Sequence, residues 1–151
     1  MLEAWRIVKS KHAETAFSGE GAARFGGRWN SRGVAVVYTS ATRSLAALET
    51  LVHLNPPVLF SYKIIGIRFR EELLEHLSPA LLSADWRAEP PAQSTMRLVD
   101  RWVREERSAV LAVPSAIVPE ELNYLLNPAH RDFKKISIGD AMEFAFDKRL
   151  I

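Results

Sequence analysis

The chain contains no cysteine, and this absence removes several chemistries at once. Disulfide bonds, thiolate nucleophiles and cysteine-ligated zinc sites all depend on that residue. Its absence also fits a reducing compartment, so we predict a cytoplasmic protein. Long apolar runs are missing too, because no stretch approaches the about 20 apolar residues that a membrane-spanning helix needs. The N-terminus lacks the basic and apolar regions of a secretory signal, and we expect neither membrane insertion nor secretion.

A large excess of charge is likewise absent. The formal net charge is +2 over 151 residues, which is too small to indicate a nucleic-acid-binding protein. The charge is unevenly distributed, however. Residues 1–50 contain seven Lys/Arg against four Asp/Glu, a net of +3, whereas residues 51–100 have a net of −1 and residues 101–151 are neutral. A positive field over the first third of the chain favours anionic ligands, phosphates in particular.

The remaining composition is that of one soluble globular domain. Hydrophobic residues make up 48% and charged residues 25%, and the length suffices for a proper core. We therefore expect a single domain over residues 1–151. Strand-like and helix-like segments alternate without a regular βαβ rhythm. This order predicts an α+β fold with a mixed, largely antiparallel and split sheet flanked by helices.

Apolar runs predict the strands. They are expected at residues 5–8, 33–39, 58–70 and 108–118, with a final strand in which Met142, Phe144 and Phe146 alternate with polar residues. Gly66 predicts a kink or bulge within its strand. Between the first two strands, residues 18–33 hold five of the seven glycines and are expected to form a loop or two short strands. Residues 123–130 are expected to be rich in turns.

Three helices are expected from apolar stripes and caps. The first is capped by Thr39 or Ser40 and ends at Asn55-Pro56-Pro57, and a short second one covers residues 71–77. The third is capped by Ser94 or Thr95 after a long connection over residues 78–92. Their inward stripes are Ala41, Leu45, Leu48 and Val52 for the first helix, and Leu98, Val99, Trp102 and Val103 for the third.

Arg28 is the first residue that suggests chemistry. It follows two glycines in Gly26-Gly27-Arg28-Trp29-Asn30, where the backbone can come close to a ligand. A guanidinium matches two phosphate oxygens at once, so Arg28 is a candidate for binding a phosphorylated ligand. The alternative is a hairpin turn whose arginine faces solvent.

Tyr38 and Glu49 complete an ordered trio with Arg28. Tyr38 ends an apolar strand, where its ring packs on the core or stacks against a flat heterocycle such as nicotinamide. Glu49 lies at the margin of a helical apolar stripe, and a carboxylate there is either solvated or held for a task, because uncompensated burial is costly. A pair with His53 is the structural alternative. We expect no metal, since the other histidines lack ligand spacing.

Ser115 and Asn123 are candidates for supporting roles. Ser115 is a lone hydroxyl in an apolar run between two prolines. No Gly-x-Ser-x-Gly turn surrounds it, so a hydrogen bond that orients a ligand or a carboxylate is a better prediction than nucleophilic attack. Bonding to a backbone carbonyl is the structural alternative. Asn123 belongs to a polar cluster with Asn127 and His130, in which an amide could recognise a ligand or orient Ser115, whereas Asn127 fits a turn.

Taken together, these segments resemble the RES-domain toxins. The resemblance rests on Gly26-Gly27-Arg28-Trp29-Asn30, Val37-Tyr38-Thr39, Ala47-Leu48-Glu49, Val113-Pro114-Ser115-Ala116 and the segment from Asn123 to His130, in the order and spacing of that family. It implies an ADP-ribosyltransferase-like fold and a toxin of a bacterial toxin–antitoxin pair. The implied substrate is NAD+, cleaved at its nicotinamide–ribose bond, with no further cofactor.

The resemblance also implies roles for individual residues and a partner. Arg28, Tyr38, Glu49 and Ser115 would form the catalytic site, and Arg6 and Asn123 would help to bind the substrate. The implied partner is an Xre-like DNA-binding antitoxin that occludes this site in a hetero-oligomer. Whether ADP-ribose passes to water, phosphate or a protein is left open. Two alternative functions are a nucleic-acid-binding module, in which Trp29 stacks on bases, and a binding protein without catalysis.

Overall fold

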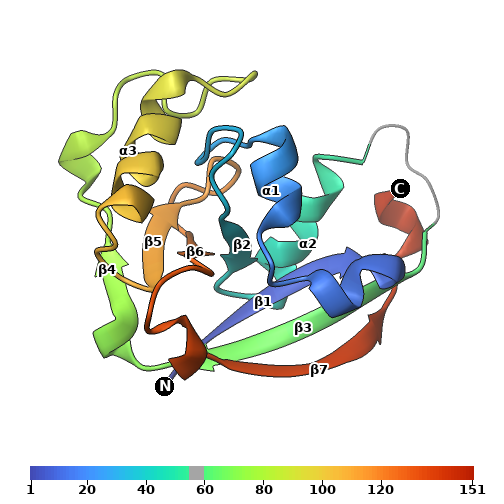
Figure 1. Ribbon diagram of the computed structural model, residues 1–151. Coiled ribbons are helices and arrows are strands. Elements are labelled where there is room, and N and C mark those ends of the chain that lie inside the picture. The colour runs from blue at the N-terminus through green and yellow to red at the C-terminus, as the bar shows by residue number, and fades with distance from the viewer. Residues whose placement is uncertain (55–59) are drawn as a thin grey trace.

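The computed structural model describes residues 1–54 and 60–151, and in this part the strands form one seven-stranded sheet (Figure 1). The strand order is β4-β5-β6-β2-β1-β3-β7. All neighbours pair antiparallel except β4 and β5. The strands are β1 (Leu2–Lys9), β2 (Val37–Ser40), β3 (Tyr62–Phe69), β4 (Leu74–His76), β5 (Val110–Pro114), β6 (Leu122–Leu126) and β7 (Ser137–Phe144).

A single residue pair joins the two halves of this sheet. Trp5 of β1 lies opposite Ser40 of β2, whereas β1 pairs with β3 along its whole length. The half β1-β3-β7 and the half β4-β5-β6-β2 therefore lie at different angles (Figure 1). The predicted α+β class with a largely antiparallel, split sheet is confirmed.

The two halves pack against each other through one apolar cluster. It contains Phe69 of β3 together with Val110 of β5 and Leu126 of β6, all buried. The ring of Phe69 meets that of Tyr124 edge to face, with 5.3 Å between the centroids. Such pairs add to the free energy gained from burial. The core thus holds β2 and β6, which carry polar site residues, against β1.

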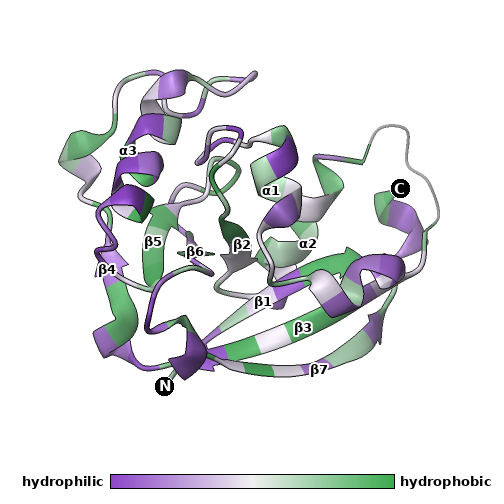
Figure 2. Cartoon of the chain, in the orientation of Figure 1, coloured by the Kyte–Doolittle hydropathy of each residue, from purple (hydrophilic) through white to green (hydrophobic). Residues whose placement is uncertain are grey.

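Helix α3 (Gln93–Arg104) covers the other face of β5 and β6. Its Val99 and Trp102 are completely buried among Leu111 and Leu125, while its outer side is polar (Figure 2). The Trp102 indole donates to Ser108 Oγ at 2.8 Å, and the Ser108 hydroxyl donates to the Val110 carbonyl oxygen. The burial of Val99 and Trp102 confirms this part of the predicted inward stripe of the helix.

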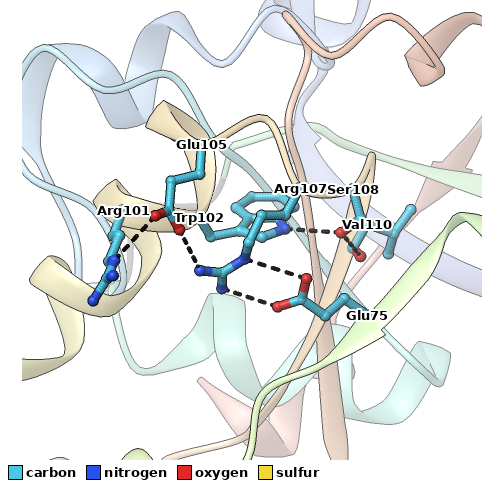
Figure 3. Close-up of polar contacts among 7 residues, drawn as sticks. All are labelled: Glu75, Arg101, Trp102, Glu105, Arg107, Ser108 and Val110. Carbon is cyan, nitrogen blue, oxygen red and sulfur yellow. Dashed lines mark hydrogen bonds and ion pairs between the residues drawn. The ribbon is translucent and has the colours of Figure 1, made fainter.

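Charged side chains tie the end of α3 to the outer strand. Arg107 donates to both carboxylate oxygens of Glu75 on β4 and to Glu105, which also pairs with Arg101 (Figure 3). The hydrogen bonds from Arg107 and Arg101 lower the pKa of the Glu105 carboxyl, and the bond from Arg107 has the larger effect. The network lies just before β5, since Ser108 follows Arg107 directly and its hydroxyl donates to the carbonyl oxygen of Val110, the first residue of β5 (Figure 3).

Several predicted elements are wrong. Residues 20–25, expected in a loop or strands, form helix α1 (Glu20–Phe25), and residues 71–77 form a 3-10 turn (Glu71–Leu73) followed by β4. Residues 123–126, expected within a segment rich in turns, belong to the strand β6. The bulge at Gly66 is confirmed, because the register with β7 shifts between Ile65 and Ile67.

Helix α2 (Arg43–Leu51) differs from its prediction in cap and face. Thr42 is the N-cap, since its side chain accepts from the Leu45 amide, and Thr39 and Ser40 belong to β2. The buried residues are Leu45 and Ala46, whereas Leu48 and Val52 are exposed. The inward face is therefore rotated toward Glu49. The predicted stop at residues 55–57 lies outside the described residues.

Likewise, Ala92 precedes α3 as its N-cap and makes no side-chain cap bond, so the prediction of Ser94 or Thr95 is wrong. Thr95 lies inside the helix, where its hydroxyl donates to the Arg28 carbonyl oxygen at 2.5 Å.

Within the described residues, no helix has the length and apolar character needed to cross a membrane.

Candidate active site

The carboxylate of Glu49 is the centre of the site. Glu49 is half-buried on the inward side of α2. Its Oε1 accepts two hydrogen bonds, from Ser115 Oγ at 2.7 Å and from Asn123 Nδ2 at 2.8 Å. Within the described part of the chain, Oε2 accepts no hydrogen bond. One oxygen is thus fixed by two neutral donors, whereas the other keeps its capacity to accept hydrogen bonds.

Ser115 reaches Glu49 from the residue after β5. It is completely buried, and its Oγ accepts from the amides of Ile117 and Val118, each at 3.1 Å. Because these two donors occupy the oxygen's lone pairs, the hydroxyl hydrogen is directed to Glu49. The geometry makes Ser115 a support for the carboxylate. Its hydroxyl donates to the Glu49 side chain and not to a backbone carbonyl, which was the structural alternative.

Asn123 reaches the same carboxylate oxygen from β6. Its Nδ2 donates to Glu49, and its Oδ1 accepts from the hydroxyl of Ser40 at 2.7 Å. Asn123 and Ser40 are both buried and lie opposite each other in the sheet. Asn127, by contrast, accepts from the Ala129 amide in a turn, as predicted.

Tyr38 uses its hydroxyl to hold the glycine-rich segment. The oxygen accepts from the Trp29 amide at 3.1 Å and donates to Asn30 Oδ1 at 2.5 Å. Gly27 packs against this hydroxyl so tightly that a Cβ there would lie 2.7 Å from it. Burial raises the pKa of Tyr38, so the phenol stays protonated at every physiological pH.

We predict that Tyr38→Phe destabilises the fold by about 1–3 kcal/mol, because it leaves the Trp29 amide and the Asn30 oxygen without this partner. Thermal unfolding would measure the loss. Tyr124→Phe is the matched control, since the Tyr124 hydroxyl makes no hydrogen bond to the residues that the structure describes, and it should cost less. Equal losses for the two variants would contradict a structural role of the Tyr38 hydroxyl.

Arg6 is a half-buried cation on β1, and no acidic group of the described chain pairs with it. Its Nε donates to the Ala16 carbonyl oxygen at 2.7 Å, and its Nη1 donates to that of Tyr38 at 3.0 Å. Burial lowers the pKa of Arg6 to about 10, which leaves it charged at neutral pH. A desolvated positive charge of this kind favours an anionic ligand.

Arg28 is turned toward the connection before α3. Its Nη1 donates to the carbonyl oxygens of Trp86 at 3.0 Å and Ala88 at 2.8 Å, and its Nη2 pairs with Glu89 at 3.2 Å. Its side chain is only 16% exposed, so the alternative of a solvent-facing hairpin arginine does not describe it. In this conformation Arg28 already holds a carboxylate.

Tyr38 links the predicted residues in space. Its hydroxyl accepts a hydrogen bond from the amide of Trp29, the residue that follows Arg28. Arg6 contacts the Tyr38 carbonyl group. The structure therefore brings Glu49, Ser115 and Asn123 into direct contact, and joins Tyr38 to Arg6 and to the residue that follows Arg28.

Comparison with known proteins identifies the family of this chain. A family model described as the RES domain matches residues 3–147. The chain belongs to the RES domain family. A "Prs ADP-ribosylating toxin" of Sphingobium sp. (strain YBL2) is 41% identical, and the match covers 97% of this chain and 95% of that protein. "Toxin Res" of Photorhabdus laumondii is 39% identical, with 97% and 96% covered. By this kinship the chain is a RES-family toxin.

A solved structure shares the fold of this RES protein. A chain in the crystal structure of the M. tuberculosis MbcT–MbcA toxin–antitoxin complex superposes with a TM-score of 0.78. The match covers 95% of this chain and 84% of that chain at 16% identity. The likeness at this identity establishes the fold.

Two buried contributors to the site of the RES protein were not predicted in these roles. Ser40 was expected to cap a helix, and Asn30 had no assigned role. Asn30 is completely buried, and its side-chain amide donates to the carbonyl oxygens of Ala22 and Val34. The pairing of Ser40 with Asn123 on neighbouring strands would have indicated the role of Ser40. The strand β6 was not predicted from the sequence, so this pairing could not be recognised.

Proposed function

We propose that this RES protein cleaves the nicotinamide–ribose bond of NAD+ and acts as the toxin of a bacterial type II toxin–antitoxin pair. The observation that carries the proposal is the carboxylate of Glu49, whose Oε1 is held by Ser115 and Asn123. Cleavage of a glycosidic bond builds positive charge on the sugar, and a preorganised carboxylate stabilises that charge. The unengaged Oε2 would face the ribose.

The two arginines supply the affinity for the dinucleotide in this mechanism. Arg6 brings a half-buried charge that no acidic group of the described chain neutralises. Arg28 would bind the pyrophosphate by exchanging its present partners, the 86–89 backbone and Glu89, for phosphate oxygens. The ring of Tyr38 would stack on nicotinamide, while its hydroxyl keeps holding residues 29–30.

We expect Arg6→Gln to raise the KM for NAD+ by about 10- to 100-fold, because a charged hydrogen bond to an anion is worth about 1.5–3 kcal/mol. Initial rates over a range of NAD+ concentrations would measure this. Arg68→Gln is the control, since Arg68 is an exposed strand arginine paired with Glu3. A KM that stays at the wild-type value in a folded Arg6→Gln protein would remove Arg6 from the binding site.

The acceptor of ADP-ribose separates three versions of the reaction. Water gives a glycohydrolase and inorganic phosphate gives a phosphorylase, and both deplete NAD+ in bulk. A protein acceptor gives an ADP-ribosyltransferase, and the name of the Sphingobium relative favours this version as the second candidate. Mass spectrometry of the products from NAD+, with and without phosphate and with cell lysate, distinguishes the three. An NAD+ pool that stays constant would exclude bulk depletion.

The proposal includes a partner, an Xre-like antitoxin that covers the site in the cytoplasm. A solved relative of the same fold was crystallised as a toxin–antitoxin complex, which supports a proteinaceous partner. Induction of the toxin alone should arrest growth, and co-expression of the neighbouring gene should restore it. Direct nucleic-acid binding is not expected. An affinity for DNA that falls steeply with salt and is unchanged by substitution of Glu49 would favour the alternative of a nucleic-acid-binding module.

A further inference from the structure

Ser40 ends β2 at the junction of the two half-sheets. Its backbone lies opposite Trp5 on one side and Asn123 on the other. Ser40 is 4% exposed, and its hydroxyl donates to Asn123 Oδ1 at 2.7 Å. The hydroxyl therefore acts on a side chain that itself contacts the Glu49 carboxylate.

The direction of these bonds is fixed by the carboxylate. An ionised carboxylate can only accept, so the amide of Asn123 must present its Nδ2 to Glu49 Oε1. The amide oxygen then points away from Glu49 into a buried region, where it needs a donor. Ser40 provides that donor. In the flipped amide, two oxygens would face each other and the contact with Glu49 would be repulsive.

The neighbouring residue shows that this arrangement is not a general property of hydroxyls on β2. Thr39 is also buried, but its Oγ1 donates to the backbone carbonyl oxygen of Tyr124 at 2.7 Å. Thr39 thereby supports the pairing of β2 with β6. Ser40 instead orients a side-chain amide, and the two hydroxyls form a natural pair of test and control.

We propose that Ser40 is a positioning residue of the active site, which acts through Asn123 to keep the Glu49 carboxylate aimed at the sugar. The relay runs from the Ser40 hydroxyl to the Asn123 amide and then to Glu49 Oε1. It rests on the proposed NAD+ cleavage, because it assigns a purpose to the orientation of that carboxylate. Ser115 holds the same oxygen independently from the end of β5.

A double-mutant cycle on turnover tests the relay. Ser40→Ala should lower kcat about 10- to 100-fold, as expected for a slightly misplaced catalytic group, with little change in KM. In an Asn123→Ala background the same substitution should lower kcat by less than about twofold, because the residue through which it acts is gone. Thr39→Val, which also deletes a buried hydroxyl, should leave kcat close to the wild-type value. Additive losses in the cycle, or a wild-type kcat for Ser40→Ala, would overturn the proposal.

A second measurement does not depend on catalysis. Nuclear magnetic resonance of the ¹⁵N-labelled protein can follow solvent exchange of the Asn123 side-chain hydrogens. Exchange should be slow in the wild type and in Thr39→Val, and fast in Ser40→Ala. Unchanged slow exchange in Ser40→Ala would reject the relay. If the wild type left NAD+ intact, the proposed function would fail, yet the exchange data would still decide whether Ser40 positions Asn123.

Discussion

Glu49→Gln is expected to lower the rate of NAD+ cleavage by 10²–10³-fold, which corresponds to about 3–4 kcal/mol of lost transition-state stabilisation. The substitution removes the negative charge that would face the sugar. It should leave the fold intact, because the glutamine side-chain oxygen can still accept from Ser115 and Asn123. Single-turnover cleavage of NAD+ and the thermal unfolding midpoint would be measured side by side.

Glu120→Gln is the matched control for this experiment. Glu120 is an exposed glutamate for which the structure describes no hydrogen bond or ion pair, so its loss of charge should change neither rate nor stability. NAD+ loss at the wild-type rate in the Glu49→Gln protein would take Glu49 out of the mechanism. A thermal unfolding midpoint of Glu49→Gln well below that of the wild type would instead indicate a structural role for the carboxylate.

Trp102→Ala is expected to destabilise the protein by about 3–5 kcal/mol. The indole is completely buried between α3 and the strands β5 and β6, so its removal leaves a cavity. It also takes away the donor to Ser108 Oγ at 2.8 Å. Native domains have only about 5–15 kcal/mol of stability, so much of it would be lost. Urea unfolding should show a lower midpoint with an unchanged slope.

Trp86→Ala supplies the comparison. Trp86 is only partly buried and meets Trp29 with 6.3 Å between the ring centroids, so its truncation should cost clearly less. A loss for Trp102→Ala no larger than that for Trp86→Ala would mean that α3 contributes little to the core. The site would then be held by the two half-sheets alone.

The sequence predicted those parts of the fold that local pattern controls. The bulge at Gly66 and the buried Val99 and Trp102 follow from residue type and spacing. It failed where partners distant in the sequence decide. The strand β4 exists because Leu74–His76 pair with β5, and β6 exists because both its neighbours pair with it, although its asparagine is typical of turns.

Competition for backbone groups explains another difference. The apolar run from residue 33 predicted a strand, but β2 begins only at Val37. The Gly33 amide donates to the Ala23 carbonyl oxygen, and the Val34 carbonyl oxygen accepts from the Asn30 side chain. Those groups are then not available to a strand partner. The buried side chain of Asn30 thus shortens the strand and shapes the loop that carries Arg28.

The residues of the candidate site could be predicted from the sequence, but the hydrogen bonds between them could not. Glu49, Ser115 and Asn123 stood out as polar residues in apolar surroundings, and the structure joins them in one hydrogen-bonded group. That Ser40 completes this group depends on its register with Asn123. That Arg28 holds Glu89 depends on the fold of the connection before α3, for which no local pattern exists.

The sequence distances within the Glu49 cluster have a consequence for synthesis of the protein. Ser115 follows Glu49 by 66 residues, and Asn123 follows it by 74. At about 5–20 residues per second, a ribosome adds Asn123 about 4–15 seconds after Glu49. Until then the growing polypeptide lacks at least one of the two donors, and it lacks the complete strand β6 that separates β5 from β2. Under the proposed function, the nascent toxin is therefore inert at least until Asn123 has been added, because the Glu49 cluster is incomplete before that point.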